Sequence, residues 1–224
     1  MVEMSIGSLV IHGYQGRDVP NRLFKQAGQA DTLAVIFPGL NYSADMPLLF
    51  YPAELLRQRG ADVLQLHTDY TVVEYQTAPL HERLLWLLTD AGAAIQAAQT
   101  QSQYKHLLLI GKSIGTLVLA QLVTAGLASE AITIWLTPLL HQPFLVASAE
   151  RCQSPALFIA GTHDSTYDAE ALEKIQQAPG AKTLVIEGAN HSLQIPHDVF
   201  ASLRVMERVL QEIDRFLEQQ LKPK

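Results

Sequence analysis

Short apolar runs alternate with longer amphipathic stretches along most of the chain. Runs of four or five mostly apolar residues, typical of buried parallel strands, lie at residues 33–37, 63–66, 107–110, 132–136, 156–160 and 183–186. Apolar residues at helical spacing fall between them, at residues 46–59, 80–99, 117–125 and 169–177. This alternation predicts an α/β fold, with a mostly parallel central sheet and helices on both of its faces.

Both ends of the chain add elements to this arrangement. Residues 4–11 and 19–24 are β-type runs separated by Gly13 and Gly16, which predicts an antiparallel hairpin at one edge of the sheet. A last helix is predicted near the C-terminus, where apolar residues recur at intervals of four and three. We expect one face of this helix to pack on the sheet through Val199, Leu203, Met206, Leu210, Ile213 and Leu217.

Composition narrows the class of protein. With 224 residues and 48% hydrophobic content, the chain suits one globular domain over residues 1–224. A net charge of −6 without a basic run argues against a nucleic-acid surface and against recruitment to an anionic membrane. No apolar run reaches the roughly 18 residues of a membrane span. Residues 1–5 lack the features of a signal peptide, and Cys152 is the only cysteine, so we expect a soluble, cytoplasmic protein. The oligomeric state stays open.

The central strand leads into a motif with chemical meaning. Residues 107–110 run directly into Gly111-Lys112-Ser113-Ile114-Gly115, and a helical pattern follows at once. A Gly-x-Ser-x-Gly sequence between a strand and a helix is typical of a nucleophile elbow, which exposes the serine hydroxyl above the sheet. A phosphate-binding loop would need a glycine at position 106, which is His106 here, so that alternative is disfavoured.

An acidic residue and a histidine follow two later strands. Asp164 comes after the strand at 156–160, and His191 comes after the strand at 183–186. Ligand sites in such sheets lie beyond the carboxyl ends of the strands, so both side chains are expected near Ser113. With its near-neutral titration, a histidine can take the serine proton, while a carboxylate on its other nitrogen fixes the tautomer. We therefore assign Ser113 as nucleophile, His191 as general base and then acid, and Asp164 as orienting acid.

Other residues compete for these roles. His163 precedes Asp164 and is expected to point away from the serine, and His197 is a second alternative to His191. Asp168 is the alternative to Asp164, whose own non-catalytic role would be to cap a turn. The spacing of His163, His191 and His197 fits no strong zinc pattern, so no metal is expected. Serine hydrolysis of this kind needs no cofactor, and none is expected. Cys152 is expected to be a structural thiol.

With its serine, acid and histidine in this order, the chain resembles the α/β-hydrolase superfamily over nearly its whole length. Within it, the resemblance is to small serine hydrolases of the esterase or dienelactone-hydrolase type. It implies an oxyanion hole made by the backbone N–H of Ile114 and one from the loop at residues 38–40, with Leu40 favoured over Asn41. Asn41 and Tyr42 are pocket candidates or ordinary turn residues. Lys112 is expected to face solvent, the alternative being that it helps to attract an anionic substrate. Trp86 and Trp135 are expected in the core.

These features predict a serine hydrolase that cleaves an ester, thioester or related acyl bond of a small soluble substrate through an acyl-enzyme. The alternatives are an amidase or peptidase, an acyltransferase, or a protein that keeps the fold for binding alone. Residues 137–155, the connection in which superfamily members often carry a cap, have room for one short helix here. The cap is therefore expected to be minimal or absent, which favours short acyl groups.

Overall fold

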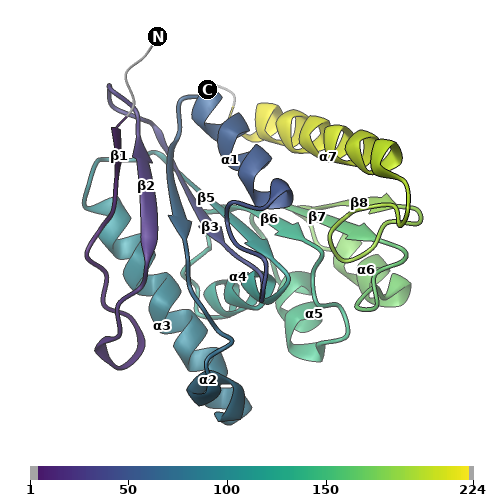
Figure 1. The fold of residues 1–224 in the computed structure, drawn as a ribbon, viewed down its shortest axis with the longest axis horizontal. Helices are drawn as coiled ribbons and strands as arrows, with labels where there is room; N and C mark the ends of the chain where they lie inside the picture. The colour runs from purple at the N-terminus through teal and green to yellow at the C-terminus, as the bar shows by residue number, and fades with distance from the viewer. Residues whose placement is uncertain (1–4, 222–224) are drawn as a thin grey trace.

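An eight-stranded sheet runs through the centre of the molecule, which a computed structural model describes for residues 5–221 (Figure 1). Its strands lie in the order β1-β2-β4-β3-β5-β6-β7-β8. The bounds are β1 Ser5–Gly7, β2 Asn21–Lys25, β3 Thr32–Phe37, β4 Asp62–Leu66, β5 His106–Lys112, β6 Ile132–Leu136, β7 Ala156–Gly161 and β8 Ala181–Ile186. The strands from β4 to β8 in this order pair in parallel, while β2 pairs antiparallel with both β1 and β4. The predicted mostly parallel sheet is confirmed.

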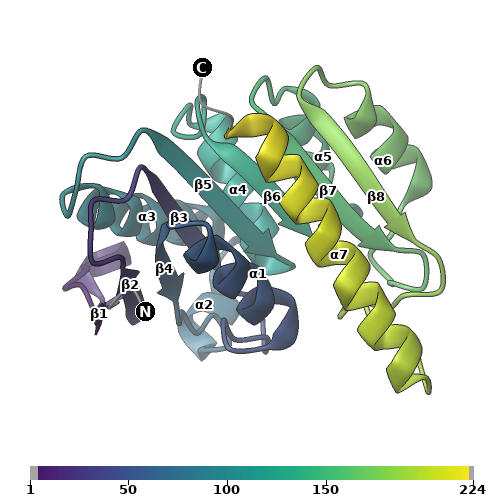
Figure 2. The same ribbon diagram turned by 90° about the horizontal axis from the view of Figure 1, so that it is seen from above.

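Helices cover both faces of this sheet. Figure 2 shows α1 (Pro47–Gln58) and α7 (Val199–Gln220) side by side on one face. The other face carries α3 (Leu80–Gln99), α4 (Ile114–Thr124), α5 (Pro143–Glu150) and α6 (Ala169–Gln176). Alternate strand residues face the two layers, so the sheet separates two apolar cores. Trp86 and Trp135 are buried, as expected. The short helix α2 (Val73–Thr77) and the 3₁₀ turn at Tyr14–Gly16 were not predicted.

The N-terminal hairpin is present but shorter than predicted. Three residues of β1 pair with β2, and the connection between them is held by the backbone bond from Val19 N–H to the Ile11 carbonyl. Met4, the first residue of the predicted run, and most of the segment assessed for a signal peptide lie outside the described residues. Between residues 5 and 221, no helix is long and apolar enough to cross a membrane.

The predicted apolar face of the last helix is wrong in its first part. Val199 and Leu203 are 65% and 59% exposed, and the residues of α7 that are buried are Val205, Val209, Ile213, Phe216 and Leu217. Figure 2 shows the reason: the first turns of α7 project past the ends of the strands, and only the rest of the helix crosses the sheet. The sequence periodicity continued into turns of the helix that lie beyond the sheet.

Candidate active site

Ser113 occupies a sharp reversal between β5 and α4. The strand ends at Lys112 and the helix begins at Ile114, so Ser113 alone turns the chain, with φ 54° and ψ −116°. Two glycines make this reversal possible. A Cβ on Gly115 would lie 2.3 Å from the Phe37 carbonyl oxygen, and a Cβ on Gly111 would lie 2.3 Å from the Gly115 carbonyl oxygen. The spacing of the Gly-x-Ser-x-Gly motif therefore follows from backbone packing around the turn.

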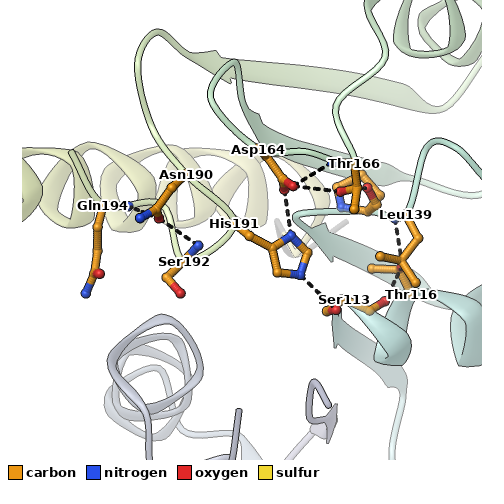
Figure 3. Close-up of polar contacts among 10 residues, drawn as sticks. Ser113, Thr116, Leu139, Asp164, Thr166, Asn190, His191, Ser192 and Gln194 are labelled. Atoms are coloured by element: carbon orange, nitrogen blue, oxygen red, sulfur yellow. Dashed lines mark hydrogen bonds and ion pairs between the residues drawn. The ribbon is translucent and has the colours of Figure 1, made fainter. Parts of the chain in front are cut away.

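The side chains of Ser113, His191 and Asp164 form a continuous relay of hydrogen bonds (Figure 3). His191 Nε2 lies 2.8 Å from Ser113 Oγ, and His191 Nδ1 lies 2.7 Å from Asp164 Oδ2. With its proton on Nδ1, the imidazole donates to the carboxylate and leaves Nε2 free to accept the serine proton. Asp164 follows β7 and His191 follows β8, so the three residues meet beyond the carboxyl ends of parallel strands.

Asp164 is held as a carboxylate. Burial on its own would raise the pKa of this group, but hydrogen bonds from His191 and Thr166 outweigh that effect and leave the pKa below its ordinary value. Thr166 donates twice to Oδ1, from its backbone N–H at 2.8 Å and from its hydroxyl at 2.9 Å. The other oxygen, Oδ2, is left for His191. Sequence reasoning missed Thr166, although Asp-x-Thr is a common pattern for this kind of turn.

The competing residues lie elsewhere. Asp168 is the N-cap of α6, where its carboxylate accepts the backbone N–H of Ala171 at 3.0 Å. His163 and His197 both have exposed side chains and hydrogen-bond neither Ser113 nor Asp164 within residues 5–221. Of the residues proposed for the three roles, the structure brings together Ser113, Asp164 and His191. The same part of the chain holds no cluster of three or more His, Cys, Asp or Glu side chains suited to a metal.

The loop after β3 packs directly against the serine. Gly39 and Tyr42 close a tight turn through two backbone hydrogen bonds of 3.0 and 3.3 Å, with Asn41 at φ 55°. A Cβ on Gly39 would lie 3.4 Å from the Ser113 Cβ. The backbone N–H groups of Leu40, Asn41 and Ile114 donate no hydrogen bond to any described residue. These three donors remain available to a ligand oxygen, and hydrogen bonding within the protein does not choose between Leu40 and Asn41.

A cavity of about 390 Å³ opens beside this turn. Asn41 and Tyr42 line it on one side, and the loop after β4, from His67 to Asp69, lines it on the other. Tyr42 also anchors the helix that follows, because its hydroxyl accepts the Leu48 N–H at 2.9 Å. Burial, together with the charge of Arg22, lowers the pKa of His67. Nothing in the sequence pattern indicated His67, because it follows an ordinary buried strand.

Lys112 differs most from its sequence-based expectation. Its side chain is 2% exposed and therefore does not face solvent. The prediction was wrong because alternation along β5 places Lys112 on the same side as Leu108 and Ile110, under the layer formed by α1 and α7. Its ammonium group lies 4.6 Å from the centre of the Tyr42 ring.

Comparison with known proteins agrees with this fold. Residues 39–218 match the family model described as the alpha/beta hydrolase domain. No curated protein matches the sequence significantly. The structure is similar to a protein of unknown function from Agrobacterium tumefaciens described as an alpha/beta hydrolase (18% identity, TM-score 0.74, covering 97% of this chain and 100% of that chain). It is also similar to a cold-adapted esterase from an Arctic intertidal metagenomic library (19% identity, TM-score 0.70, covering 99% of this chain and 95% of that chain). A third similar structure is a serine hydrolase without a lid from Xanthomonas campestris (16% identity, TM-score 0.72, covering 98% of this chain and 96% of that chain).

Proposed function

Because this chain belongs to the alpha/beta hydrolase domain family, we propose that it is a serine hydrolase acting on an ester, thioester or related acyl bond. The observation that supports this most is the relay at 2.8 and 2.7 Å from the Ser113 hydroxyl through His191 to Asp164. A serine hydroxyl is a weak nucleophile, and a base held at hydrogen-bond distance activates it. The carboxylate of Asp164 orients this base and stabilises its protonated form.

The first half of the proposed reaction forms an acyl-enzyme. Ser113 Oγ attacks the carbonyl carbon of the substrate while His191 Nε2 takes the hydroxyl proton. The carbonyl oxygen gains negative charge and accepts hydrogen bonds from the N–H groups of Ile114 and Leu40, which form the oxyanion hole. Collapse of this intermediate breaks the bond to the alcohol or thiol, which leaves with the proton that His191 returns to it.

The second half repeats the same proton transfers with water. His191 takes a proton from a water molecule, whose oxygen attacks the acyl carbon on Ser113. The second tetrahedral intermediate uses the same oxyanion donors and then releases the acid, while the proton returns to the serine oxygen. The strained turn at Ser113 keeps the hydroxyl directed at both the histidine and the incoming carbonyl.

The proposed substrate is small. The connection after β6 contains one short helix, α5, which packs on α4 and α6 in the layer below the sheet. No cap therefore arises from this connection. The cavity beside the turn at residues 39–42 has a volume of about 390 Å³. It is an open recess between two loops and not a long apolar tunnel. Such a site favours short acyl groups over long chains, which need an extended apolar wall.

A fluorophosphonate probe tests this proposal, because it reacts with activated serines and needs no knowledge of the natural substrate. We expect wild-type protein to be labelled at Ser113, Ser113→Ala to resist labelling, and His191→Ala to react orders of magnitude more slowly. Ser165→Ala is the matched control, since Ser165 is exposed next to Asp164 and lies outside the relay. Absence of labelling in folded wild-type protein would show a chain that keeps the fold for binding alone.

A further inference from the structure

Lys112 is a buried cation next to the proposed nucleophile. No hydrogen bond or ion pair joins its ammonium group to any residue between 5 and 221. Burying a charge without a partner is costly, and lysine is rarely fully buried for that reason. Its neighbours on the same face of β5, Leu108 and Ile110, are apolar core residues. The presence of lysine therefore calls for a role other than stabilising the core.

The contacts of Lys112 lie at both ends of one turn. Its ammonium group faces the Tyr42 ring, 4.6 Å from the ring centre. Its stem passes so close to Gly39 that a Cβ there would lie 2.9 Å from the Lys112 Cδ. Gly39 and Tyr42 are the two residues whose backbone bonds close the turn carrying Leu40. Lys112 therefore contacts the turn at Gly39 and at Tyr42, the two residues that fix its position.

We propose that Lys112 is a positioning residue, whose ammonium group holds Tyr42 and thereby keeps the Leu40 N–H directed at the oxygen of the substrate carbonyl. The inference rests on the proposed function. A cation over an aromatic face is attractive, and the attraction is stronger when both groups are out of water. Loss of the ammonium group releases the turn, and an oxyanion donor displaced by about an ångström loses most of its effect on the rate.

The surroundings of the Lys112 ammonium group determine the pH range in which it is charged. Burial lowers the pKa of Lys112 to about 8, and the nearby Asp164 carboxylate acts in the opposite direction. Asp164 is also bonded to His191, and the ionisable group that Lys112 faces is Tyr42. Burial raises the pKa of Tyr42, so its ring stays neutral where Lys112 titrates. Lys112 is therefore mostly charged at pH 7 and mostly neutral above about pH 8.

Lys112→Met separates positioning from structure, because methionine keeps the stem and removes the charge. We expect the rate of fluorophosphonate labelling of Ser113 to fall about 10- to 100-fold. We expect the melting temperature to rise by about 2–4 °C, because a buried charge that has no hydrogen-bond partner has been removed. A residue with only a structural role would lower both. Lys182→Met is the control, since Lys182 is exposed on β8 and lies 6.0 Å from the Phe216 ring; it should label at the wild-type rate.

A double-mutant comparison tests whether Lys112 acts through Tyr42. Tyr42→Leu removes the ring, so the double variant with Lys112→Met should label no more slowly than the slower single variant. Tyr42→Phe keeps the ring and should lose less labelling than Tyr42→Leu. Equal labelling of wild type and Lys112→Met, or fully additive losses in the double variant, would overturn this inference and leave the proposed hydrolase intact. Failure of wild-type protein to label would overturn both.

Discussion

His191 Nε2 lies 2.8 Å from Ser113 Oγ although 78 residues separate them in the chain. The two strands that precede them, β5 and β8, are also separated in the sheet by β6 and β7. The loop after β8 must therefore reach back across two strands. Asn190 stabilises this path, because its side-chain oxygen accepts the backbone N–H groups of Ser192 and Gln194 at 2.9 and 3.1 Å (Figure 3). The position of the His191 imidazole therefore depends on a loop whose conformation is held by hydrogen bonds within the loop.

The two carboxylates that compete for the acid role give the first prediction. Asp164→Asn should lower kcat by about 10⁴-fold, because the amide favours the wrong histidine tautomer. Asp168→Asn should keep wild-type activity, since asparagine also caps helices well. The measurement is hydrolysis of a 4-nitrophenyl ester by both variants, with circular dichroism as a check on folding. Full activity in Asp164→Asn would assign the acid role to another residue.

Thr166 gives a second prediction. Thr166→Val removes one of its two hydrogen bonds to Asp164 and keeps the shape of the side chain. A hydrogen bond to a charged group contributes about 1.5–3 kcal/mol, and we expect kcat/KM to fall about 10-fold, since the carboxylate can still bond His191. The pKa of Asp164 should rise towards its ordinary value, because one of the hydrogen bonds that lowers it is lost, and an NMR titration of this carboxyl group in both proteins measures the change. An Asp164 pKa equal to that of wild type, or an unchanged kcat/KM, would contradict this role.

Two glycines provide a matched pair for stability. Gly115→Ala should fail to fold or should unfold at a much lower temperature, because its Cβ would lie 2.3 Å from the Phe37 carbonyl oxygen. Gly92 lies inside α3 with nothing within 4 Å of an added Cβ. Gly92→Ala should therefore raise the free energy of unfolding by about 0.5–1 kcal/mol. Thermal unfolding of both variants checks the pair, and a well-folded Gly115→Ala would contradict the packing described for the elbow.

The central sheet could be predicted because its sequence signals are local. Each parallel strand is a short apolar run, and β6 occupies the predicted residues 132–136 without change. The last helix shows where this reasoning fails. Periodicity reports that a helix is amphipathic, but it contains nothing about where the neighbouring sheet ends, so Val199 and Leu203 were predicted to be buried and are exposed.

The pH dependence of stability gives a fourth prediction. The pKa of Lys112 is lowered from 10.5 to about 8 in the folded protein. Below about pH 8, folded and unfolded chains both bind the proton, and the buried charge destabilises the folded state. Between about pH 8 and 10.5 only the unfolded chain keeps the proton, so stability rises with pH.

Relative to Lys112→Met, wild type should therefore gain roughly 1–3 kcal/mol of unfolding free energy across this window. Urea unfolding of both proteins at pH 7, 8.5 and 10 measures the difference, and the comparison cancels the titration of all other groups. A constant difference between the two proteins would show that Lys112 does not titrate in this range.

Acyl-chain length gives the fifth prediction. We expect kcat/KM to be highest for acetyl or butyryl esters of 4-nitrophenol and to gain nothing from longer chains, because α5 packs on α4 and α6 and the connection after β6 forms no cap. Each methylene buried in a long pocket would contribute about 0.8 kcal/mol. Rates that climb steadily past the octanoyl ester, or that rise at a lipid interface, would contradict a small soluble substrate.

Some residues of the candidate site could be predicted from the sequence, and others could not. Ser113, Asp164 and His191 could be proposed because a motif and two strand ends mark them, and parallel strands bring those ends to one edge. Lys112 and Thr166 depend on tertiary geometry. The burial of Lys112 follows from which face of β5 it occupies and from the helices that cover that face, and neither is written in the residues around the motif.

The backbone at Ser113 also has an evolutionary consequence. A side chain at φ 54° costs on the order of 1 kcal/mol that glycine would not incur. Mutation to glycine at this position would remove this strain together with the hydroxyl. In a lineage with no use for that hydroxyl, drift and selection for stability would act in the same direction and remove the serine. Such a position is sensitive to loss of selection for chemistry, and it would be among the first in the chain to change.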